Sequence, residues 1–71
     1  MRTKREALWR VIYIARGERQ AGQIESLLRE SGFLVERKRL PEEGSRIEDI
    51  EIKVLDAEAE EAHRFLMEQG L

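Results

Sequence analysis

The sequence predicts an α+β fold with the element order βαββα, and three observations support this prediction. Two runs, residues 8–15 and 33–40, have the β-branched and aromatic content that strands prefer. Residues 47–55 alternate between apolar and charged side chains, which is typical of a half-buried strand. Within 21–28 and 57–69, apolar residues recur at helical spacing. Two helices on one face of a three-stranded sheet would bury these apolar positions.

Length and charge limit the classes of protein to which the chain can belong. We expect residues 1–7 to form a charged lead-in and residues 8–71 to form a single domain. The chain of 71 residues has a formal net charge of −2, which excludes a strong positive field for nucleic acid or an anionic membrane. The first apolar run is far shorter than the roughly 20 residues of a spanning helix. We therefore expect a cytoplasmic protein without a membrane partner.

The first predicted strand is apolar on both of its faces. Regular alternation places Trp9, Val11 and Tyr13 on one face and Ile12 and Ile14 on the other. Because two helices cover only one face of the sheet, we expect Trp9, Val11 and Tyr13 to form an interface with a second copy or another protein. The alternative is that these side chains belong to the core.

The order of the elements also predicts how the strands pair. The basic run at 37–39 is typical of an edge strand, and the turn-rich segment 41–45 indicates a hairpin with the third strand. We expect the first strand to lie beside the third and parallel to it, in the sheet order 1-3-2. This arrangement is ferredoxin-like without its last strand, so one edge of the first strand is left unpaired.

The turn after the first strand is a candidate anion site. A glycine turn before a helix can offer backbone N–H groups to an anion, and arginines can add bidentate contacts. Arg16, Gly17 and Arg19 supply these groups here. The alternative is a tight turn with solvated arginines.

Two other features have a functional and a structural interpretation. His63 is the only histidine, and as a general base it would need a substrate pocket and an orienting group. Otherwise it is a half-exposed residue on a helix flank. The run Arg37-Lys38-Arg39, with Arg46 and Lys53, is a candidate patch for RNA or another polyanion. Acidic residues on the third strand would neutralise that patch, so we expect the run to form cross-strand pairs instead.

The chain resembles a family of small bacterial proteins of unknown function that are described as prokaryotic signal-transducing proteins. The segment from Trp9 to Gly17, the helix end at Gly32 and Phe33, and the segment 56–66 carry this resemblance, which spans residues 8–69. It implies a ferredoxin-like βαββα fold and a regulatory role with no established active site. Some short proteins of similar appearance carry a glutamate decarboxylase name. We do not expect that activity, because it needs a large pyridoxal-phosphate site and the chain has only three lysines: Lys4, Lys38 and Lys53.

These observations together predict a small non-enzymatic regulatory or protein-interaction module that forms a homodimer. We expect no cofactor, no metal site and no nucleic-acid partner. The alternative function is a module that binds a small anionic ligand at Arg16, Gly17 and Arg19.

Overall fold

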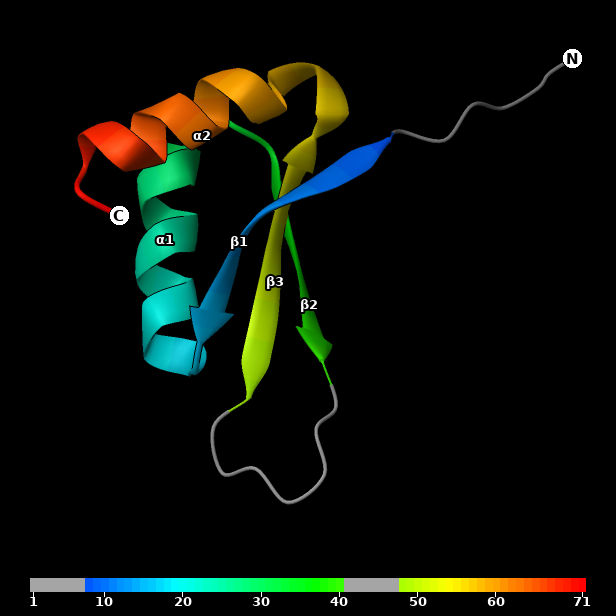
Figure 1. Cartoon of the computed structure of the whole chain (residues 1–71), viewed down its shortest axis with the longest axis vertical. Helices are drawn as coiled ribbons and strands as arrows, with labels where there is room; N and C mark the ends of the chain where they lie inside the picture. The colour runs from blue at the N-terminus through cyan, green and yellow to red at the C-terminus, as the bar shows by residue number, and fades with distance from the viewer. Residues whose placement is uncertain (1–7, 41–47) are drawn as a thin grey trace, which may run out of the picture.

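The computed structural model describes residues 8–40 and 48–71, which fold in the order βαββα (Figure 1). The strands form one open three-stranded sheet in the order β1-β3-β2, which confirms the predicted fold class and strand order. The predicted lead-in 1–7 and the predicted turn 41–45 lie outside the described residues. The elements are β1 (Trp9–Arg16), α1 (Glu18–Glu30), β2 (Val35–Leu40), β3 (Asp49–Leu55), the short 3-10 helix η1 (Asp56–Glu58) and α2 (Ala59–Glu68).

Both neighbouring strand pairs in the sheet are antiparallel. The prediction that the first strand runs parallel to the third is therefore wrong. Since β3 follows β2 in an antiparallel hairpin and α1 is the crossover between β1 and β2, the two parallel strands are β1 and β2. The middle strand, β3, runs against both of them.

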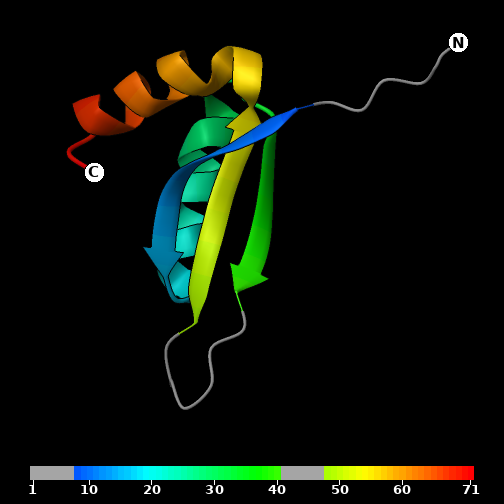
Figure 2. The ribbon, with the colours of Figure 1, turned by 45° about the vertical axis from the view of Figure 1, so that its right-hand side comes forward.

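Both helices cover the same face of the sheet, as the sequence predicts (Figure 2). On β3 the buried side chains are Ile50, Ile52 and Val54, each at most 1% exposed. The alternation along β3 therefore predicts correctly which face of the sheet is buried. In Figure 1, α1 runs alongside the strands, whereas α2 lies across the end of the sheet where β3 ends. The helices complete this core with Ala21, Ile24 and Leu28 from α1 and Ala59, Ala62 and Leu66 from α2.

A β-bulge in β1 changes which of its side chains face the helices. Val11 lies opposite Lys53 and Tyr13 lies opposite Ile52, so Ile12 is an extra residue without its own partner on β3. An extra residue shifts the alternation of all residues beyond it by one position. Before the bulge, the odd-numbered residues of β1 face the open side of the sheet, and after the bulge the even-numbered residues do.

The bulge moves Tyr13 to the helix-covered face. Tyr13 packs against the core, and its hydroxyl accepts a hydrogen bond of 3.5 Å from Nε2 of Gln20. Ile14, which lies opposite Glu51, faces the open side together with Trp9 and Val11. The prediction that Tyr13 shares a face with Trp9 and Val11 is wrong, because it assumed regular alternation through Ile12.

Two glycine-to-alanine substitutions are expected to change stability in opposite directions. Gly17 joins β1 to α1 at φ 93° and ψ 164°, a region that strains an alanine, so G17A should lower the free energy of unfolding by about 1–3 kcal/mol. Within α1, a Cβ added at Gly22 meets no atom within 4 Å, so G22A should raise the free energy of unfolding by up to about 1 kcal/mol. Urea unfolding of both variants measures these changes. Shifts of the same sign would contradict this account of the two positions.

Candidate interaction surface

The face of the sheet that the helices leave open carries an apolar strip along β1. Trp9, Val11 and Ile14 form this surface, which we call the β1 strip, and their exposed fractions are 37%, 39% and 50%. On this face, the neighbouring positions of β3 are charged over most of its length: Asp49, Glu51 and Lys53. The exposed apolar surface of the open face is therefore concentrated at the β1 edge.

β1 is also an edge strand, and its hydrogen bonds show which backbone groups face outward. The carbonyl of Leu8 accepts from the N–H of Asp56 at 2.8 Å. At the other end of β1, the N–H of Gly17 donates to the carbonyl of Glu48, also at 2.8 Å. Residues of an antiparallel pair alternate between pointing toward the partner strand and away from it. With the bulge included, the residues whose N–H and C=O groups point away from β3 are Trp9, Val11, Ile14 and Arg16. Of these groups, the N–H of Arg16 already donates to Oε1 of Gln20 at 2.7 Å.

The predicted anion site at Arg16, Gly17 and Arg19 already has protein partners for two of its residues. Nε of Arg16 lies 2.9 Å from Oδ1 of Asp49, and the Gly17 N–H is bonded as described above. Glu18 adds a carboxylate to the first turn of α1, where an anion would have to sit. Arg19 is exposed on α1. Anion binding at this turn stays a prediction.

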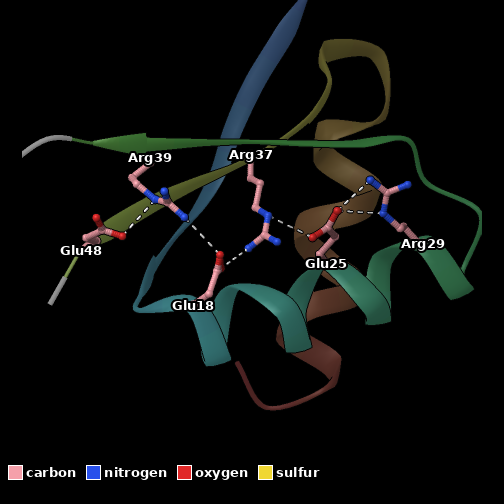
Figure 3. Close-up of polar contacts among 6 residues, drawn as sticks. All are labelled: Glu18, Glu25, Arg29, Arg37, Arg39 and Glu48. Atoms are coloured by element: carbon pink, nitrogen blue, oxygen red, sulfur yellow. Dashed lines mark hydrogen bonds and ion pairs between the residues drawn. The ribbon is translucent and has the colours of Figure 1, made fainter.

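The basic run of β2 contributes two arginines to a chain of ion pairs between β2 and α1 (Figure 3). Glu18 binds Arg37 at 2.7 Å and Arg39 at 3.3 Å. Glu25 binds Arg37 at 3.2 Å and Arg29 at 2.7 Å. We call this group the ion-pair chain, and its six members are Glu18, Glu25, Arg29, Arg37, Arg39 and Glu48, which binds Arg39 at 3.0 Å.

The ion-pair chain differs from the cross-strand pairs that the sequence predicts. Arg37 and Arg39 point to the helix-covered side of the edge strand β2, and their partners are mainly carboxylates of α1 rather than of β3. Glu18 and Glu25 are seven residues apart, which places them on one face of a helix, and that spacing is the signal that could have identified them. Lys38 faces the open side opposite Glu51, and Arg46 lies outside the described residues.

Removing one carboxylate should show how much the ion-pair chain stabilises the fold. Glu25 is only 18% exposed at its side chain and contacts two arginines. We expect Glu25→Gln to lower the free energy of unfolding by about 0.5–1 kcal/mol at low ionic strength and by less in high salt. The matched control is Glu30→Gln on the same helix, an exposed residue with no ion pair among the described residues. A loss from Glu25→Gln that is independent of salt would contradict an electrostatic role.

His63 lies at a cleft of about 500 Å³ between β1 and the start of α2. Arg10 and Asp56 line the same cleft and bind each other, with 2.5 Å between Nε and Oδ1. The His63 side chain is exposed, and within the described residues the structure shows no hydrogen bond that would orient its ring. Across residues 8–40 and 48–71, no three His, Asp or Glu side chains are arranged to hold a metal ion.

Comparisons with protein-family models, with curated proteins and with solved structures found no match to this chain. The resemblance to the small bacterial proteins therefore stays a prediction. In the described part of the chain, every helix is too short or too polar to cross a membrane. The function has to be argued from the surface of the molecule, and the β1 strip is its most distinctive feature.

Proposed function

We propose that this protein is a small non-enzymatic interaction module that forms a homodimer through the β1 strip. The observation that supports this proposal is the line of Trp9, Val11 and Ile14 on the open face, beside the outward backbone groups of the same strand. Large apolar side chains that gather on one surface are typical of association sites, and tryptophan is among the strongest anchors.

The arrangement of the helices indicates why this surface would take a partner. Among residues 8–40 and 48–71, both helices cover one sheet face and no helix or strand covers the other. An antiparallel sheet can expose one face to water, but that face is then usually polar along every strand. β3 and β2 follow that rule on the open face, with residues such as Glu51 and Lys38. β1 departs from it, and this supports a role of the β1 strip in association.

A second copy is the partner that this proposal names. A two-fold dimer places the same patch of both molecules at one interface, so one apolar strip is sufficient to build it. The net charge of −2 adds little long-range repulsion between copies. Anion binding is not proposed as the function, because Arg16 and Gly17 are bonded within the protein.

Charge substitutions at matched exposed positions test this function. We expect sedimentation velocity to show a dimer for the unaltered protein and a monomer for Ile14→Glu, since a carboxylate in the strip would lose its water on association. The control is Met67→Glu on α2, where an exposed apolar side chain away from the strip is replaced by the same charge. Circular dichroism should show the native fold for both variants. A monomer at every concentration of the unaltered protein would overturn the proposal, as would equal dissociation by both substitutions.

A further inference from the structure

We infer that the two copies associate by antiparallel pairing of their β1 strands about a two-fold axis that passes between Ile12 and Tyr13. The inference rests on the proposed function and specifies its geometry. Because this axis is perpendicular to the sheet, the two sheets would lie edge to edge and form one continuous sheet. The helices of both copies would then lie on one face of that sheet, and both β1 strips would lie on the other.

The spacing of the outward backbone groups carries this inference. The residues that point away from β3 are Trp9, Val11, Ile14 and Arg16, at intervals of two, three and two positions. A regular strand offers outward groups at every second position, so it can match β1 on only one side of the bulge. The intervals of β1 are the same from either end. A second β1 running in the opposite direction therefore matches all four positions. Within each copy the N–H of Arg16 donates to Oε1 of Gln20 at 2.7 Å, so pairing with Trp9 of the second copy requires this N–H to exchange that acceptor for the Trp9 carbonyl.

This register also brings compatible side chains together on the open face. Val11 lies opposite Ile14 of the second copy, which forms two equivalent apolar pairs near the axis. Trp9 lies opposite Arg16 of the second copy, where the guanidinium can approach the indole ring while Nε keeps its pairing with Asp49. Arg10 lies opposite Ala15 of the second copy on the helix side. Arginines of the two copies are therefore not placed opposite each other.

The bulge gives the edge selectivity as well as complementarity. Bulges commonly protect edge strands, because they disrupt pairing with ordinary strands of other chains. Here the same disruption is present in both copies at symmetric positions, so it is compatible with self-pairing. Such an edge would reject most foreign strands and accept its own copy, which is how a specific interface combines attraction with exclusion.

Disulfide cross-linking tests the register directly, because the chain contains no cysteine of its own. In the inferred dimer, residue 11 of one copy lies opposite residue 14 of the other, at the roughly 5.5 Å Cα separation that a disulfide can span. A mixture of Val11→Cys and Ile14→Cys proteins should form a mixed disulfide dimer under mild oxidation. Each variant alone should form none, because like positions lie several residues apart across the axis.

The outcomes separate this inference from the proposed function. Mixed disulfides in the mixture and none in the single variants would support both. If sedimentation shows a dimer but the mixture does not cross-link, or each variant cross-links with itself, the inferred register is wrong and the proposed function stands. If neither variant nor the unaltered protein forms a dimer, both are wrong. Circular dichroism and thiol titration would establish that each variant is folded and that its thiol is free to react.

Discussion

Replacing Leu28 with alanine is expected to lower the free energy of unfolding by about 2–5 kcal/mol, the range for buried leucines in other proteins. Leu28 is 0% exposed and packs in the core between α1 and the sheet. The loss combines the transfer energy of the removed groups with the cavity that they leave. Domains of this kind are stable by only about 5–15 kcal/mol, and small ones have small cores, so the loss should be a large part of the total.

Urea unfolding followed by circular dichroism measures this effect, and Leu34→Ala is the matched control. Leu34 precedes β2 and is 58% exposed, so its truncation should change the free energy of unfolding by no more than about 0.5 kcal/mol. Comparable losses for the two variants would contradict the placement of the core between the helices and one face of the sheet.

The neighbours Ala15 and Ile14 are expected to respond oppositely to a glutamate. Ala15 is 0% exposed opposite Ile50 on the core face, so Ala15→Glu would bury a charge without a partner. Such a change costs several kcal/mol, and we expect the chain not to fold. Ile14 is 50% exposed on the other face, so Ile14→Glu should fold and fail only in association.

Far-UV circular dichroism and amide NMR spectra of the two variants check this contrast. If β1 alternated regularly from Trp9, Ile14 would lie on the helix-covered face and Ala15 on the open face. Ile14→Glu would then be the substitution that prevents folding. A folded Ala15→Glu protein together with an unfolded Ile14→Glu protein would therefore show that the bulge is absent.

The sequence predicts the helix-covered face of β3 correctly because that strand alternates in the simplest way. Ile50, Ile52 and Val54 are separated by charged residues, and a central strand with one dry face admits a single assignment of its two faces. The strand order is also predicted correctly, because the order of the elements indicates a hairpin of β2 and β3 with β1 beside β3. The prediction that β1 and β3 are parallel is wrong, because β3 runs antiparallel to both of its neighbours.

The open face of β1 could not be predicted in the same way. The bulge at Ile12 depends on how β1 pairs with β3, and the apolar run contains no charged residue between Val11 and Ala15 to mark the change in alternation. Regular alternation therefore places Tyr13 on the wrong face and does not identify Ile14 as part of the open face. The partners of Arg37 and Arg39 were missed because they depend on where α1 lies against the sheet, which strand patterns do not specify.

Hydrogen exchange of the β1 amides at different protein concentrations tests most directly the claim that this strand edge is the site of self-association. The N–H groups of Val11 and Ile14 point away from β3, whereas those of Tyr13 and Ala15 point toward it. We predict slow exchange of Tyr13 and Ala15 at every concentration, and exchange of Val11 and Ile14 that becomes slower as the dimer forms. Fast exchange of Val11 and Ile14 at all concentrations would contradict the account.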